Sequence, residues 1–119
     1  MIIAYWIVAG IAALVFMAAG AMKLARPKEA LAASGMAWTE DFTSPSVKLI
    51  GAAEVLGGIG LILPMLTGVA PILSPIAGAA LAILMVGAAV THIRRSEPPI
   101  PFALVLLAAA AAILGFIVL

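Results

Sequence analysis

The residues that could carry chemistry in this chain are few, and the most unusual is Glu54. It lies inside an apolar run from Val47 to Leu66, where an ionisable side chain is costly unless it is paired, hydrated or neutral. Lys23 and His92 end two other apolar runs and are the candidate partners of Glu54. Such a carboxyl group can bind the polar head of a ligand or exchange a proton with it. Glu54, Lys23 and His92 are therefore the predicted ligand-binding or proton-exchange residues.

Each of these residues also has a purely structural interpretation. A Glu54–Lys23 ion pair, or a neutral hydrogen-bonded Glu54, would only join two helices. Lys23 and Lys48 lie near the ends of apolar runs, where a lysine usually extends its ammonium group toward the lipid head groups. Lys48 also lies on a different helix face from Glu54. A histidine such as His92 at a span end is typical of a membrane interface. Both interpretations stay open at this point.

The rest of the chain offers no catalytic constellation. There is no cysteine, which excludes disulfides, thiolate nucleophiles and cysteine-ligated iron–sulfur clusters. Glu54 and His92 alone are too few ligands for a structural zinc site, so no metal site is predicted. No phosphate-binding loop, Ser/His/Asp set or cofactor fingerprint is present. No catalytic residue and no resident cofactor is therefore predicted.

Composition decides the class of protein. Hydrophobic residues make up 66% of the 119 residues and charged residues 9%, whereas a soluble domain carries about 25% charged residues. The net charge is +1 and no basic stripe exists, which excludes a nucleic-acid partner. A soluble enzyme lacks the polar surface it would need. The chain is predicted to be an integral membrane protein whose partner is the lipid bilayer.

Four apolar runs predict four membrane-spanning helices, at about 2–24, 46–66, 71–92 and 100–119. A run of about 20 residues crosses the hydrocarbon core as a helix. The runs show no alternation of apolar and polar residues, and backbone groups in lipid must be satisfied within the segment. The predicted fold is all-α, an integral membrane four-helix transmembrane bundle that forms a single transmembrane domain over residues 1–119.

The long loop at 23–46 is predicted to be cytoplasmic and to hold a short interfacial helix at 27–35. Pro27 suits the first position of that helix and Gly35 the position after its end. Trp38 stands where an interfacial aromatic residue is expected. Ser44 and Pro45 are a suitable N-cap and first residue for the next span.

The basic residues predict the orientation. All six Lys and Arg side chains flank two loops on one side of the bundle, and the opposite side has none. The positive-inside rule places these loops in the cytoplasm and both termini outside, in a multi-pass plasma-membrane protein. Arg94 and Arg95 are interpreted as topology anchors, with an anionic lipid head group as the alternative contact.

Small residues predict where the helices approach one another. Gly51, Glu54, Gly58 and Leu61 share one helix face, so Glu54 lies on a groove that another helix or a ligand could enter. Gly51 and Gly58 are therefore included among the candidate ligand-binding residues. Further small-residue seams are expected on the last two spans, at Ser74, Gly78 and Ala82 and at Ala111 and Gly115.

Two segments carry a family resemblance. The first span ends Ala19-Gly20-Ala-Met-Lys23-Leu24, and the second reads Gly51-Ala-Ala-Glu54-Val-Leu-Gly57-Gly-Ile-Gly60-Leu-Ile-Leu-Pro64. The chain resembles the DoxX-like family of small bacterial four-helix membrane proteins over nearly its whole length. The family takes its name from a subunit of a thiosulfate:quinone oxidoreductase, and its motif falls here on Lys23 and Glu54.

The resemblance implies a bacterial inner-membrane protein with a link to redox complexes. The predicted function is a non-catalytic membrane subunit that binds a lipophilic molecule, with quinone the suggested ligand, for an oxidoreductase partner. One alternative is a transporter of a small solute or protons that acts as a homodimer, with Glu54 as the titrating group. A second alternative is a structural membrane scaffold. The missing cysteine argues against thiol chemistry by this chain.

Overall fold

The computed structural model describes all residues from 1 to 119, and the chain folds into helices without any strand. The long helices are α1 (Ile2–Ala25), α3 (Ser44–Thr67), α4 (Leu73–Arg94) and α5 (Pro101–Val118). Each of these four is long and apolar enough to cross a membrane. Two short elements, α2 (Lys28–Ala33) and the 3₁₀ helix η1 (Ala37–Asp41), lie between α1 and α3. The predicted all-α membrane four-helix bundle is confirmed.

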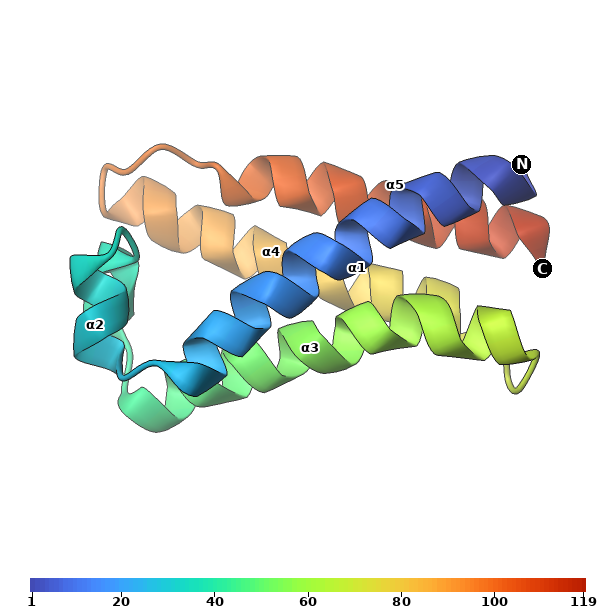
Figure 1. Cartoon of the computed structure of the whole chain (residues 1–119). Helices are drawn as coiled ribbons and strands as arrows, with labels where there is room; N and C mark the ends of the chain where they lie inside the picture. The colour runs from blue at the N-terminus through green and yellow to red at the C-terminus, as the bar shows by residue number, and fades with distance from the viewer.

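The long helices pack in two pairs, α1 with α3 and α4 with α5. Contacts between α3 and α4 and between α1 and α5 close the bundle. Both termini lie at one end, which we call the terminal end, and α2 with η1 covers the other, which we call the α2 end (Figure 1). The bundle therefore has two different ends, and the chemistry of the chain is divided between them.

Close backbone contacts hold each helix pair together. A Cβ atom on Gly20 of α1 would lie 2.5 Å from the carbonyl oxygen of Gly51 in α3, and one on Gly51 would lie 2.8 Å from the carbonyl oxygen of Gly20. In the other pair, a Cβ atom on Gly78 would lie 2.9 Å from the backbone nitrogen of Ala112. Apolar helices in lipid associate through such packing, because water supplies no driving force there.

Packing at the terminal end is tight and includes two polar links. Tyr5 is fully buried, and its hydroxyl donates to the carbonyl of Leu61 at 2.6 Å. The backbone N–H of Met65 donates to Ser74 Oγ at 3.1 Å. Pro64 has no N–H to donate within α3, so these side chains supply hydrogen bonds where the helix ladder is weakest. These hydrogen bonds link α3 to α1 and to α4 at the terminal end.

Three helices begin at residues other than the expected ones. The N-cap of α3 is Thr43, not Ser44, because Thr43 Oγ1 accepts the N–H of Ser46 at 3.3 Å. Pro27 is the N-cap of α2 rather than its first helical residue. The third long helix begins at Leu73 rather than at residue 71. Its preceding residues form a turn in which the φ angles of Gly68 and Ala70 are positive.

Candidate functional site

An ion pair between α1 and α3 forms the centre of the site. Lys23 Nζ lies 2.7 Å from Glu54 Oε1, and the two side chains are only 7% and 2% exposed. The Gly20–Gly51 contact brings the backbones of α1 and α3 together close to this point, which lets a lysine from one helix meet a glutamate from the other. The interpretation of Lys23 as a lysine that extends to the head groups is therefore wrong, because its ammonium group is turned inward.

The Glu54 carboxylate is incompletely satisfied. Oε1 lies 2.7 Å from the Lys23 ammonium, and no other N–H or O–H group of the protein donates to the carboxylate. An ionised carboxylate can accept about four hydrogen bonds through its two oxygens. A buried carboxylate with a single partner is costly. It therefore retains the capacity to accept a further hydrogen bond from a bound molecule.

Trp38 joins the pair to the other half of the bundle. The Lys23 ammonium lies 5.6 Å from the centre of the Trp38 ring, within the range of a cation–π contact. On its other side, Trp38 lies 6.3 Å from the His92 ring and forms an edge-to-face contact with Phe42. Trp38 was expected only as an interfacial aromatic residue. Its place in the site depends on how the loop folds back over the bundle, which no local pattern shows.

His92 enters the site from α4 but does not contact Glu54. Its Nδ1 atom lies 3.6 Å from Glu97 Oε1, in the loop that follows α4. Of the two partners expected for Glu54, Lys23 makes the contact and His92 pairs elsewhere. The two acidic groups Glu54 and Glu97 therefore each have their own basic neighbour, with the Trp38 ring between the two pairs.

A cavity of about 530 Å³ lies between these groups. Its volume falls within the roughly 300–1,000 Å³ range of small-molecule sites. Glu54, Lys23, Trp38 and His92 supply polar and aromatic groups around it, and most of the remaining wall is apolar. Residues of α1, α3, α4, α5 and the α2–η1 segment all contribute, among them Ala19, Met36, Phe42, Ile50, Leu84, Met85, Ala88, Thr91, Pro101 and Leu104.

Gly51 and Gly58 lie outside this cavity. A Cβ atom on Gly58 would lie 2.5 Å from Met17 Cγ in α1, and the nearest neighbours of Gly51 are also in α1. The expected ligand groove along this face of α3 is therefore filled by α1. Of the residues on that face, only Glu54 lines the cavity. The sequence showed that a partner approaches this face but not which one.

Lys48 stabilises the α2 end of the bundle. Lys48 Nζ donates to the carbonyls of Lys23, Leu24 and Arg26 at 2.8, 3.0 and 2.6 Å, and so satisfies the last carbonyl groups of α1. This ties the start of α3 to the end of α1, directly beside Lys23. The lysine expected to extend to the head groups is a helix cap.

Arg95 connects the end of α4 to η1. Its guanidinium group donates to Asp41 at 2.8 Å and Glu97 at 3.1 Å, and contacts Glu40 at 3.4 Å. The hydrogen bonds to Asp41 and Glu97 raise the pKa of the Arg95 guanidinium above its ordinary value. Beyond the expected role of a topology anchor, Arg95 holds η1 over the cavity.

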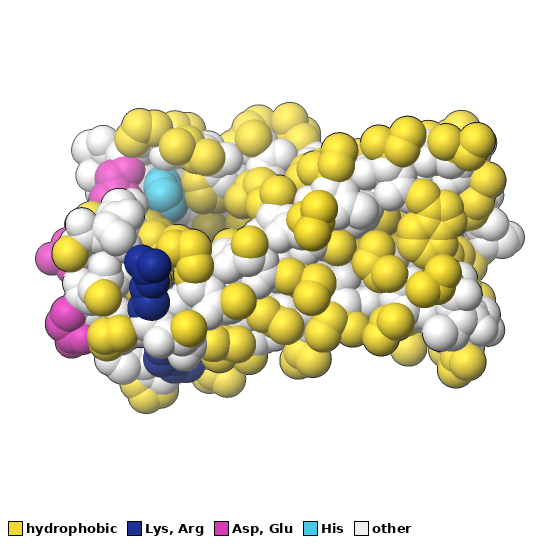
Figure 2. Space-filling model, in the orientation of Figure 1, with side chains coloured by type: hydrophobic (Ala, Val, Ile, Leu, Met, Phe, Trp, Pro, Cys, Tyr) yellow, Lys and Arg dark blue, Asp and Glu magenta, His cyan; other side chains and the backbone are white.

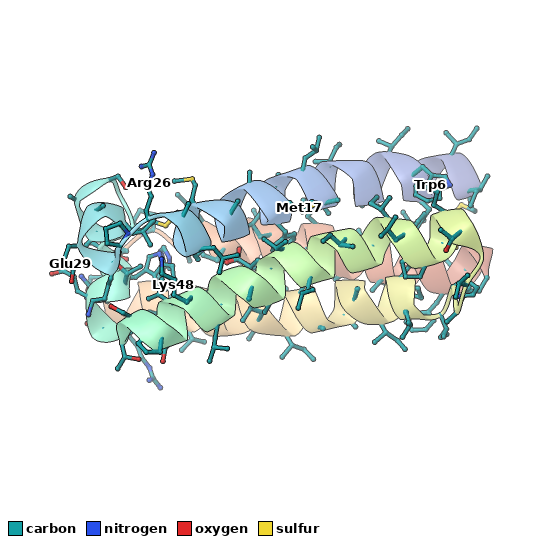
Figure 3. The ribbon with its side chains drawn as sticks, turned by 60° about the horizontal axis from the view of Figure 1, so that its bottom comes forward. Trp6, Met17, Arg26, Glu29 and Lys48 are labelled. Atoms are coloured by element: carbon teal, nitrogen blue, oxygen red, sulfur yellow. The ribbon has the colours of Figure 1, made fainter.

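The ionisable side chains gather at the α2 end. Figure 2 shows the acidic and basic groups at this end of the molecule, while the rest of the visible face is mainly hydrophobic. Figure 3 places Arg26, Glu29 and Lys48 there, far from Trp6 and with Met17 between. No three His, Cys, Asp or Glu side chains lie close enough together to hold a metal ion. The site is thus a partly apolar cavity with one buried ion pair.

Comparison with known proteins agrees with this architecture. The model of the DoxX-like family matches residues 7–113, which include the Lys23–Glu54 pair, Trp38 and His92. No curated protein and no solved structure matches the chain. Because the family model covers nearly the whole sequence, this four-helix membrane protein belongs to the DoxX-like family.

Proposed function

We propose that this protein binds a lipophilic molecule in the cavity at the α2 end and presents it to an oxidoreductase partner. The observation that supports this proposal best is a largely apolar cavity of about 530 Å³ whose wall holds the buried Lys23–Glu54 pair, with Lys23 as the one partner of the carboxylate. The protein would act as a non-catalytic membrane subunit. Quinone is the ligand that the family's redox association suggests.

The distribution of polar groups supports a ligand with a polar head and an apolar tail. A buried ion pair loses hydration energy that its mutual attraction does not fully return. A head group placed beside Lys23 and Glu54 would offset part of that loss by adding hydrogen bonds. The tail would lie against the aliphatic wall formed by Leu84, Met85 and Leu104, where burial of apolar surface is favourable.

Binding is favoured over transport by the terminal half of the bundle. Tyr5 and Leu61 are fully buried there, and the Tyr5–Leu61 hydrogen bond links α1 to α3. The cavity thus ends against a packed core in this conformation. A transporter would need a second conformation in which this core opens, whereas a binding subunit needs only the cavity that is present.

The experiment is native mass spectrometry of the protein after gentle extraction from the membrane of its own host. The proposal predicts a co-purifying lipophile or redox subunit on the wild-type protein. It predicts loss of the lipophile from the double variant Lys23→Met, Glu54→Gln and its retention by Glu29→Gln, which changes an exposed glutamate of α2. A wild-type protein that carries neither ligand nor partner would contradict the proposal.

A structural scaffold is the second candidate, and the Lys23–Glu54 contact between α1 and α3 is the observation that favours it. In that case the pair only locks two helices together. The double variant would then keep both its fold and the activity of any associated complex. A double variant that folds normally but loses its lipophile would exclude the purely structural role.

A further inference from the structure

The cavity wall carries a donor and an acceptor side by side. The Glu54 carboxylate has Lys23 as its one partner in the protein, and Lys23 Nζ contacts this carboxylate and the face of the Trp38 ring. Rotation of the carboxyl group about its last bond exchanges its two oxygens at little cost, so either oxygen can face the cavity. A head group that reaches this wall therefore meets an ammonium donor and a carboxylate acceptor together.

Charge restricts what can bind there. Lys23 and Glu54 neutralise one another as a pair. An anionic or cationic head group would bring a further charge into a weakly hydrated site with no free counter-charge, which is strongly unfavourable. The other basic residue of the cavity wall, His92, already faces Glu97. A neutral head group is the one that this wall accommodates.

Hydrogen-bonding capacity further restricts the class of head group that can bind. A carbonyl or ether oxygen can only accept, so it could bind Lys23 but would give the Glu54 carboxylate no further donor. A hydroxyl group can donate to the carboxylate and accept from the ammonium group at the same time. We infer that the cavity selects a neutral amphiphile with a hydroxyl head group, an alcohol, phenol or hydroquinone, that bridges Lys23 and Glu54. This inference rests on the proposed function and specifies its ligand class.

The test uses a matched pair of probes, 4-heptylphenol and its methyl ether. The two probes differ only in that a methyl group replaces the hydroxyl proton in the ether. Binding is measured by the change in Trp38 fluorescence in the Trp6→Phe variant, in nanodiscs of phosphatidylcholine. A hydrogen bond to a charged group corresponds to a factor of roughly 10–100 in affinity. The inference therefore predicts that the phenol binds at least about tenfold more tightly than the ether.

A variant control assigns the preference to the pair. Replacing a buried ion pair by apolar residues of similar size is usually tolerated, so Lys23→Met, Glu54→Met is expected to fold and to bind both probes equally. A preference for the phenol that persists in this double variant would overturn the assignment. If the double variant does not fold, the comparison of the two probes on the protein with both residues intact still tests the inference.

The outcomes separate this inference from the proposed function. Equal binding of the phenol and the ether to the protein with Lys23 and Glu54 intact would overturn the hydroxyl preference while the lipophile-binding function stands. Tighter binding of the ether would do the same. Absence of binding by both probes would overturn the inference together with the function on which it rests.

Discussion

At the scale of single residues, the Lys23–Glu54 contact governs both stability and binding. Removing one partner of a buried ion pair leaves a charge without compensation and typically costs about 3–5 kcal/mol. We therefore expect Glu54→Gln alone to lower the unfolding temperature markedly in detergent. The double variant Lys23→Met, Glu54→Gln should recover most of the loss, because no buried charge remains. A single variant as stable as the wild type would show that the pair is not buried as described.

Trp38 gives a second prediction at this scale. The chain has two tryptophans; Trp38 lines the cavity, while Trp6 packs against Tyr5 at the terminal end. A bound quinone, which quenches nearby indole fluorescence, should act on Trp38 alone. We expect quenching to persist in Trp6→Phe and to disappear in Trp38→Phe. The reverse pattern would place the ligand at the terminal end.

At the scale of elements, the α1–α3 crossing sets the position of the ion pair. A Cβ atom on Gly51 would lie 2.8 Å from both the Gly20 carbonyl oxygen and Lys23 Cβ. Gly51→Ala should push the helices apart and destabilise the protein by about 1–3 kcal/mol. Gly10→Ala in α1 is the matched control, because a Cβ atom there meets nothing within 4 Å. Equal unfolding temperatures for the two variants would argue against the close crossing.

The α2–η1 segment gives the next prediction at this scale. Arg95 ties η1 to the end of α4 through Asp41 and Glu40. Arg95→Gln should speed hydrogen exchange in residues 28–42 several-fold and leave the four long helices unchanged, because the tie acts only on this segment. Arg94→Gln, at an exposed neighbour without an ion pair, should change little. Unchanged exchange in Arg95→Gln would mean that other contacts hold η1 in place.

These elements also show what the sequence could and could not predict. The four spans follow from apolar runs separated by charged or proline-rich loops, and Glu54 stands out because charge is rare inside a span. The segment that carries Trp38 contacts α4 through Arg95 and Asp41, residues 54 positions apart, and no local pattern encodes that contact. The groove at Gly51 and Gly58 was assigned to a ligand because one helix alone does not show which neighbour covers it.

At the scale of the whole molecule, charge divides the bundle into two unlike ends (Figure 2). The positive-inside rule predicts that the α2 end faces the cytoplasm and the terminal end the outside of the cell. The chain has no cysteine, so a single introduced cysteine is the only thiol that a maleimide can label. Val69→Cys should react with a membrane-impermeant maleimide in intact bacteria, and Ser34→Cys only after permeabilisation. The opposite labelling would reverse the orientation.

The most direct test of the central claim asks whether the cavity holds the lipophile. Ala88 lines the cavity, and Ala88→Leu fills part of it, whereas Ala80→Leu makes the same enlargement at an exposed position of the same helix, outside the cavity. Native mass spectrometry after extraction from the host membrane is the measurement. We predict that the wild type and Ala80→Leu carry a lipophilic molecule and that Ala88→Leu does not. Equal occupancy in Ala88→Leu and Ala80→Leu would contradict the account.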